Sequence, residues 1–88
     1  MRARILVVDG NRAHLAVISS ALRPLGFTVV KAHNVADAYD VAREHLPSMI
    51  LCDVRMKETD DAGFFAKLKA DPELADVPLL FITSTAPP

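Results

Sequence analysis

The sequence lacks the features that mark disulfide-rich, membrane-spanning and secreted proteins. Its 88 residues include one cysteine, no tryptophan and only three glycines. The lone Cys52 excludes an internal disulfide and fits a reducing compartment, so we expect a cytoplasmic protein. No apolar run approaches the roughly 20 residues of a membrane span. Asp9 interrupts the apolar start MRARILVVDG, which therefore lacks the pattern of a signal peptide.

The overall balance of residues is that of a small globular domain. About half of the chain is hydrophobic (51%) and about a quarter charged (24%), with no low-complexity tract. The formal net charge of -1 argues against nucleic acid as a direct partner. Because common domains have about 100 to 150 residues, we expect a single domain, residues 1–88, with a modest core.

Hydrophobic periodicity predicts strict alternation of strands and helices. Asn11 is the expected start and Gly26 the expected end of the first helix, which presents Leu15, Ile18, Leu22 and Leu25 at helical spacing. The order β-α-β-α-β-α-β predicts an α/β fold, a parallel sheet with right-handed crossovers and helices on both faces. The predicted strands are Arg4–Asp9, Phe27–Ala32, Ser48–Asp53 and Val77–Ser84, and the other helices run from Asn34 to a stop at Pro47 and within Asp61–Ala70.

Polar residues stand at the ends of these apolar strands. Asp9 ends the first, Asp53 the third, and Thr83 with Ser84 the fourth. The carboxyl ends of parallel strands share one rim, so the two carboxylates should converge and repel each other unless a cation such as Mg²⁺ lies between them. One aspartate could then accept a phosphoryl group as an acyl phosphate, with Thr83 donating a hydrogen bond to it.

Three segments, ILVVDGN, PSMILCDVRM and DPELADVPLLFITS, resemble the receiver domain of two-component response regulators. The resemblance implies a flavodoxin-like sheet of order 2-1-3-4 and a signalling module rather than an enzyme. By position, Asp53 would be the phosphoacceptor, Asp9 and Asp53 would hold Mg²⁺ with the backbone carbonyl of Arg55, and Thr83 would bind the phosphoryl group. The implied partner is a histidine kinase or phosphotransfer protein.

The chain also departs from that family pattern. Gly10 replaces the second of two adjacent acidic residues, so Mg²⁺ binding should be weak unless Asn11 or water substitutes for it. Asn11 and Ser84 are candidates for supporting contacts around the site. After the phosphoacceptor position, Lys57 stands where proline is usual, and the loop is longer by two residues. That loop adds three carboxylates, which we expect more often in a solvated loop than in a site: Glu58, Asp60 and Asp61.

The sequence stops at Pro88, before the fourth helix, fifth strand with its lysine, and fifth helix of a full receiver. It leaves open whether Pro88 is the natural end. On this chain alone, LLFIT would be an exposed apolar sheet edge, so we expect a dimer or higher homo-oligomer. The competing function is a phosphorylation-independent pseudo-receiver that acts as an interaction module. A nucleotide- or flavin-binding domain is disfavoured because DGNRAH carries one glycine only.

Each candidate residue also has a structural interpretation. Asp53 could cap a turn, and Asp9 could favour the dipole of the helix that follows it. Cys52 is expected to fill core space. The three histidines lack metal-ligand spacing and are expected at the surface: His14, His33 and His45. The third helix should supply core or interface residues: Phe64, Phe65 and Leu68.

Overall fold

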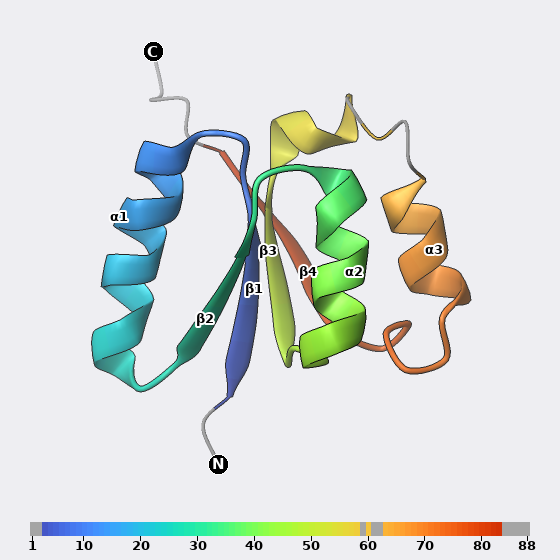
Figure 1. Cartoon of the computed structure of the whole chain (residues 1–88), viewed down its shortest axis with the longest axis horizontal. Helices are drawn as coiled ribbons and strands as arrows, with labels where there is room; N and C mark the ends of the chain where they lie inside the picture. The colour runs from blue at the N-terminus through green and yellow to red at the C-terminus, as the bar shows by residue number, and fades with distance from the viewer. Residues whose placement is uncertain (1–2, 59, 61–62, 84–88) are drawn as a thin grey trace.

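The computed structural model describes residues 3–58, 60 and 63–83, in which strands and helices alternate along the chain (Figure 1). None of the described helices is long and apolar enough to cross a membrane. The strands are β1 (Arg4–Val8), β2 (Thr28–Ala32), β3 (Met49–Asp53) and β4 (Leu79–Ile82). The helices are α1 (Arg12–Leu22), α2 (Val35–His45) and α3 (Phe64–Ala70), with 3-10 turns at Arg23–Leu25 and Val54–Lys57.

The four strands form one parallel sheet in the order β2-β1-β3-β4, as the sequence predicts. Val8, the last residue of β1, lies beside Ala32 of β2 and Cys52 of β3. Asp53, the last residue of β3, lies beside Ile82 of β4. All four strands therefore end at the same rim, and the residues that follow them share it.

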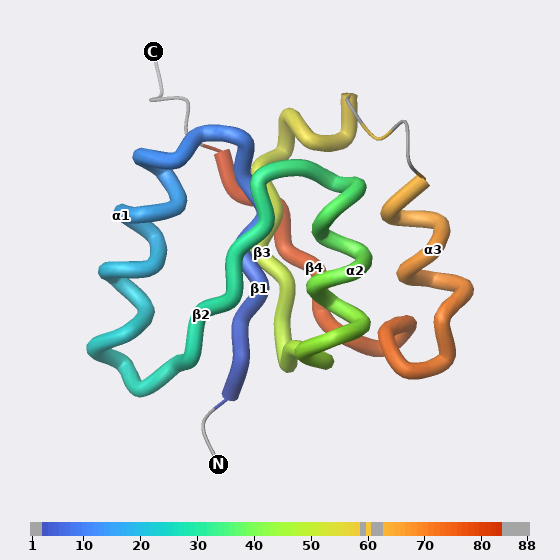
Figure 2. Tube along the Cα trace, viewed as in Figure 1, coloured from blue at the N-terminus to red at the C-terminus, as the bar shows by residue number. Residues whose placement is uncertain are grey.

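Helices cover both faces of the sheet, with α1 on one face and α2 and α3 on the other (Figures 1 and 2). Successive residues of β1 point to opposite faces, so Ile5 and Val7 pack with Leu15 of α1 while Leu6 and Val8 pack under α2. A strand that is buried on both faces is apolar throughout, which explains the run of hydrophobic residues. The larger core cluster contains Leu6, Val8, Ala32, Val35, Ala38, Ala42, Ile50, Cys52, Phe64, Leu68 and Leu74.

The predicted helix starts at Asn11 and Asn34 are confirmed. The side chain of Asn11 accepts hydrogen bonds from the first turn of α1, and that of Asn34 accepts one from Asp37 at the start of α2. The predicted end of the first helix at Gly26 is wrong, because α1 ends at Leu22 and Gly26 instead caps the 3-10 turn that follows, with φ 95°, a left-handed conformation that costs glycine little. The caps at Asn11 and Asn34 fix where α1 and α2 leave the rim of the sheet.

Several predicted details are wrong. Strand β4 starts at Leu79 rather than Val77, because Val77 donates to Leu74 within the preceding turn and Pro78 has no N–H for a ladder. Leu25 is 71% exposed, since α1 ends before it and the chain turns towards β2. Strands β2 and β3 each begin one residue later than predicted, and Asp9 and Thr83 follow their strands rather than end them.

Candidate functional site

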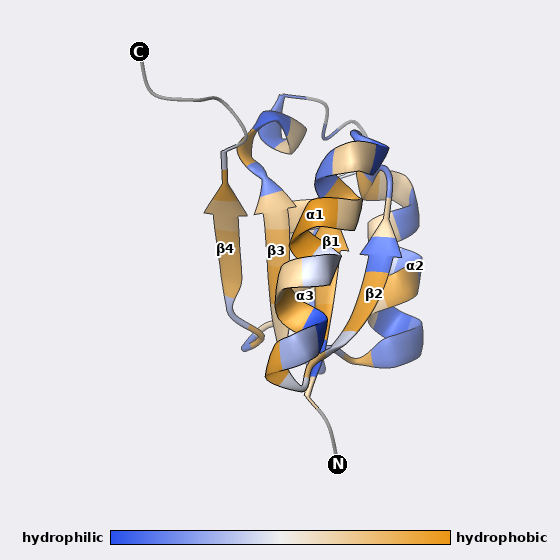
Figure 3. Ribbon diagram, turned by 90° about the vertical axis from the view of Figure 1, so that its left-hand side faces the viewer, coloured by the Kyte–Doolittle hydropathy of each residue, from blue (hydrophilic) through white to orange (hydrophobic). Residues whose placement is uncertain are grey.

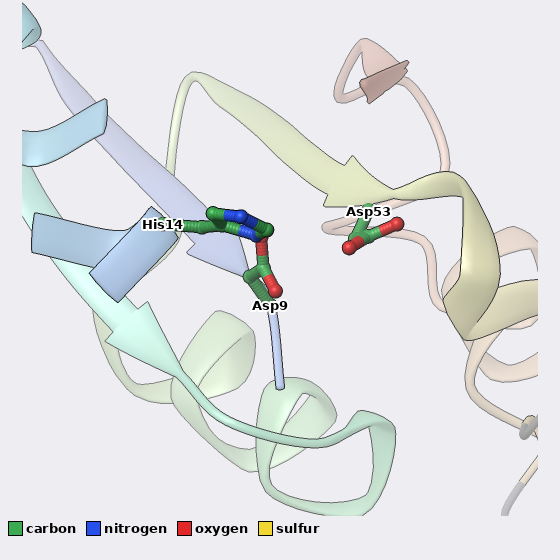
Figure 4. A group of neighbouring side chains, drawn as sticks. All are labelled: Asp9, His14 and Asp53. Carbon is green, nitrogen blue, oxygen red and sulfur yellow. The ribbon is translucent and has the colours of Figure 1, made fainter. Parts of the chain in front are cut away.

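Two buried carboxylates meet at the rim where the strands end. Asp9 follows β1 and Asp53 ends β3, and the two residues are 1% and 2% exposed. An oxygen of each lies within 4.8 Å of the other, and Figure 4 shows the two side chains facing one another across the strand ends. The predicted convergence of these residues is therefore confirmed, and it brings two largely buried carboxylates close enough to repel each other when both are charged.

Asp9 is held in place by the backbone around the start of α1. Its N–H donates to the carbonyl of Ala32 (3.1 Å), and its Oδ1 accepts a hydrogen bond from the N–H of Asn11 (2.8 Å). The side-chain oxygen of Asn11 in turn accepts from Ala13 (2.9 Å) and His14 (3.2 Å). Asn11 thus supports the site by capping α1 and by positioning one oxygen of Asp9.

Asp53 is paired with the side chain of Arg55. The guanidinium donates from Nη2 to Oδ2 (3.0 Å) and from Nε to Oδ1 (3.4 Å), and the Arg55 N–H donates to Oδ1 (2.9 Å). The side-chain hydrogen bond from Arg55 outweighs the opposing effect of burial and lowers the pKa of Asp53. The carbonyl oxygen of Arg55, which the family resemblance assigns to the metal, accepts a hydrogen bond from Glu58 (3.1 Å).

His14 lies on α1 with its side chain 32% exposed, so it is partly at the surface as predicted, but its ring also borders the site. Its Nδ1 lies 3.5 Å from Oδ2 of Asp9, and Figure 4 shows the ring beside that carboxylate. Nδ1 is buried and forms no hydrogen bond. The first turn of α1 brings this residue back over the end of β1, although the sequence offers no metal-ligand spacing between His14 and another histidine.

Two pockets open at the rim, and Asp9 lines both of them. One pocket of about 370 Å³ is bounded by Asp9, Gly10, Asn11, Asp53, Arg55 and Met56. The other, of about 360 Å³, lies between α1 and β4 and is bounded by Asp9, His14, Val17, Ile18, Ile82 and Thr83. Thr83 is thus placed at the same rim as the carboxylates, whereas Ser84 lies outside the described residues.

Gly10 leaves little room for a side chain in the first pocket. A Cβ at this position would lie 3.3 Å from the Cε of Met56 and 3.6 Å from the carbonyl oxygen of His33. The methyl group of Met56 ends a flexible side chain, so it can move by the few tenths of an ångström that a larger residue requires. A Cβ at position 10 therefore needs only a small movement of the end of the Met56 side chain.

The acidic loop after β3 has structural roles where it is described. Asp60 accepts hydrogen bonds from Phe64 (2.7 Å) and Phe65 (3.3 Å), which occupies both of its oxygens at the start of α3. Glu58 is exposed at the end of the 3-10 turn, and Asp61 lies outside the described residues. Lys57 places its ammonium 4.1 Å from the ring centroid of Phe81 on β4. The prediction of a solvated loop holds for Glu58, whereas Asp60 is half-buried and caps α3.

Cys52 fills core space, as predicted, and has no nucleophilic character. It is fully buried in the core cluster between the sheet and helices α2 and α3. Burial, with the nearby charge of Asp53 as a second cause, raises the pKa of its thiol to about 12. A thiol with so high a pKa stays protonated at neutral pH. The groups at the rim that can bind a cation or react are therefore the carboxylates of Asp9 and Asp53 and the imidazole of His14.

The donor set suits a divalent cation. Two buried carboxylates of like charge are destabilising unless positive charge lies near them, and Arg55 supplies such charge mainly to Asp53, with a weaker electrostatic effect on Asp9. Both carboxylates border a pocket that is open to solvent, where a hard cation could keep several of its waters. The residues present therefore fit Mg²⁺ at Asp9 and Asp53, with fewer acidic ligands than two adjacent carboxylates after β1 would provide.

Comparisons with known proteins agree with this arrangement. Residues 5–87 match the model of the response regulator receiver domain. The chain is 28% identical over 86 residues to the polar-differentiation response regulator DivK of Brucella anthropi, covering 98% of this chain and 70% of that protein. A response regulator structure from Desulfuromonas acetoxidans shares 29% identity with a TM-score of 0.81, covering 97% of this chain and 69% of the other.

A further solved structure shows the fold alone. The chemotaxis response regulator CheY4 of Vibrio cholerae superimposes with a TM-score of 0.84 at 23% identity, over 100% of this chain and 73% of its own. The flavodoxin-like sheet order inferred from the sequence is therefore confirmed by known receivers. With its parallel sheet, its rim of aspartates and a family match that spans nearly its whole length, this chain belongs to the response regulator receiver domain family.

Proposed function

We propose that this chain is a phosphorylation switch of a two-component pathway in which Asp53 accepts a phosphoryl group from a histidine kinase or phosphotransfer protein. One observation carries the proposal: Asp53 ends β3 at the rim, borders an open pocket and lies within 4.8 Å of a second buried carboxylate. A carboxylate oxygen of Asp53 would bond to phosphorus while the bond from phosphorus to the donor's imidazole nitrogen breaks. That nitrogen keeps the electron pair.

Mg²⁺ is the cofactor that this proposal calls for, held by Asp9 and Asp53. When bound, it would neutralise the oxygens of the incoming phosphoryl group. The backbone of Asn11 fixes one oxygen of Asp9 and leaves Oδ2 directed at the rim. We keep the carbonyl of Arg55 as a further ligand, since a carbonyl oxygen that already accepts from Glu58 has a second lone pair.

Arg55 neutralises Asp53 in the metal-free, unphosphorylated protein, where a metal ion would otherwise do so. Its guanidinium contacts both oxygens of Asp53, so either a metal ion or a phosphoryl group must share or displace these bonds. Its side chain is 58% exposed, which allows it to swing from the carboxylate without disturbing the core. We propose that Arg55 then neutralises the phosphoryl oxygens, and that Thr83, beyond the residue that pairs with Asp53, donates to them.

The test is the intact mass of the protein after incubation with Mg²⁺ and a small phosphodonor such as acetyl phosphate. We expect one phosphoryl increment in the wild type and in Asp76→Asn, a control at an exposed carboxylate in the turn before β4. The increment should be absent in Asp53→Asn. A folded wild-type protein that gains no increment would contradict the proposal and leave the pseudo-receiver, a phosphorylation-independent interaction module, as the better description.

We also propose that the chain associates with copies of itself along β4. Among the described residues β4 pairs only with β3, and Figure 3 shows it as a hydrophobic strand at the edge of the sheet. Leu80 is 51% exposed and Phe81 37%. Light scattering over a range of concentrations should show a dimer that Leu80→Lys weakens and Leu46→Lys, at an exposed site after α2, leaves intact. A monomer at micromolar concentration would contradict this.

A further inference from the structure

His14 adds a nitrogen donor to the two carboxylates of the rim. One ligand atom from each of Asp9, His14 and Asp53 can be chosen so that all three lie within 4.8 Å of one another (Figure 4). The three residues come from the end of β1, the first turn of α1 and the end of β3. Such a group differs from an acidic cluster, because an imidazole changes which metal ions it prefers.

The imidazole of His14 contacts Asp9 without forming a hydrogen bond. Nδ1 of His14 is buried, has no hydrogen-bond partner and is in ion-pair range of Asp9, so a shared cation would satisfy both groups. It lies 3.5 Å from Oδ2 of Asp9. Two ligands of one tetrahedral metal ion with bonds of about 2.1 Å lie about 3.4 Å apart, so this pair already has the separation that a shared metal ion needs.

The surroundings hold these two atoms in place and leave room for others. Asn11 caps α1 at His14 with its side chain and fixes Oδ1 of Asp9 with its backbone N–H, so Oδ2 stays directed at the imidazole. Such supporting hydrogen bonds orient metal ligands. Asp9 borders a pocket on each side, and His14 borders one of them, so water or a phosphoryl oxygen could reach the open coordination positions.

We infer that Asp9, His14 and Asp53 also form a site for a first-row transition metal ion such as Co²⁺ or Zn²⁺, with His14 as the ligand that makes such an ion bind more tightly than Mg²⁺. Mg²⁺ prefers oxygen ligands, whereas a nitrogen with two carboxylates suits the later divalent metals of the first row. The inference rests on the proposed function only in placing a cation at Asp9 and Asp53. It does not require that Asp53 be phosphorylated.

The experiment is a titration of the metal-free 88-residue protein with CoCl₂ and, separately, with MgCl₂. Calorimetry gives the two dissociation constants, and the visible absorption of Co²⁺ reports whether nitrogen and oxygen ligands surround it. We expect one equivalent of Co²⁺ to bind about 100-fold more tightly than Mg²⁺. In His14→Asn, Co²⁺ should bind at least about tenfold more weakly while the constant for Mg²⁺ changes by less than about threefold.

Two further variants keep the test decisive. His33→Asn removes an exposed imidazole between β2 and α2 and should leave Co²⁺ binding unchanged. His14→Glu replaces the nitrogen by an oxygen and should narrow the preference for Co²⁺ over Mg²⁺ while metal still binds. Thermal unfolding of each variant without metal shows whether it is folded.

The possible results separate the two proposals. Equal loss of Co²⁺ binding in His14→Asn and His33→Asn, or no loss in His14→Asn, would overturn the role of His14 and leave Mg²⁺ at the carboxylates. A wild-type protein that binds neither ion would overturn the inference and remove the metal from the proposed function. The phosphoryl increment at Asp53 is measured independently by mass, so its presence or absence does not decide this inference.

Discussion

Neutralising Asp9 tests whether the two carboxylates strain the folded protein. Asp9 and Asp53 each offer an oxygen within 4.8 Å of the other, and both are almost fully buried. At that distance two unit charges repel by about 3.5 kcal/mol with an effective dielectric constant of 20. Each charge is spread over two oxygens and Arg55 offsets part of that on Asp53, so the net relief is smaller. We expect Asp9→Asn to stabilise the metal-free protein by about 1 kcal/mol.

This stabilisation is large enough to measure in a domain of this size. About 1 kcal/mol raises the midpoint of thermal unfolding by roughly 4 to 8 °C. The asparagine oxygen can still accept the hydrogen bond from Asn11, so the local backbone should be preserved. Asp76→Asn, at an exposed carboxylate, should change the free energy of unfolding by less than about 0.5 kcal/mol.

Added Mg²⁺ should reverse the order of the two proteins. Binding to the folded state alone stabilises it, so the wild type gains more from Mg²⁺ than a variant that lacks one carboxylate. Calorimetric unfolding with and without 10 mM Mg²⁺, roughly the level for a weak site, measures both effects. A lower midpoint for metal-free Asp9→Asn than for the wild type would refute the reasoning, because it would mean that Asp9 stabilises the fold rather than strains it.

Three further predictions concern the same rim. Gly10→Asp should raise Mg²⁺ affinity by about tenfold in calorimetry, because it adds a second carboxylate after β1 whose Cβ meets only the flexible end of Met56 closely. Unchanged affinity would contradict this. The Cys52 thiol, with its pKa raised to about 12, should not react with a thiol reagent at about pH 8 until urea unfolds the protein. Rapid labelling of Cys52 in the native protein would contradict this prediction. Arg55→Gln should raise the pKa of Asp53, which NMR titration of the carboxyl carbon measures. A carboxyl group whose pKa is lowered by folding contributes stability that is lost as pH falls through its folded-state pKa. Arg55→Gln should therefore lose less stability than the wild type on acidification below about pH 5. An equal loss of stability in the two proteins would count against the Arg55–Asp53 ion pair.

The sequence predicted those parts of the site that depend on position along a strand. Asp9, Asp53 and Thr83 follow or end apolar runs, and in a parallel sheet the ends of such runs must share a rim. The caps at Asn11 and Gly26 could also be predicted, because asparagine is preferred before a helix and glycine after a helical turn. The backbone of the site could therefore be placed without coordinates.

The directions of side chains could not be read in the same way. Arg55 was considered only for its backbone carbonyl, and nothing in the sequence indicates that its long side chain folds back onto Asp53. His14 was placed at the surface because it lacks metal-ligand spacing to other histidines. A usable signal did exist: a residue three positions after the capping Asn11 lies in the first helical turn, next to the end of the preceding strand.

The acidic loop shows the limit of composition as a guide. Asp60 lies seven residues after Asp53 and suggested added negative charge at the site. Its oxygens instead accept from the first N–H groups of α3, where the helix needs a cap because Gly63 has no side chain to provide one. Which of several carboxylates binds a cation and which caps a helix is decided by tertiary geometry.

The decisive experiment is to find which residue carries the phosphoryl group after phosphorylation. Borohydride reduces an aspartyl phosphate to homoserine, which peptide sequencing by mass spectrometry can place on a single residue. In protein treated with Mg²⁺ and a phosphodonor, we expect homoserine at Asp53 and not at Asp9 or Asp60. Homoserine at another carboxylate, or a phosphoryl group that remains on His14, would contradict it.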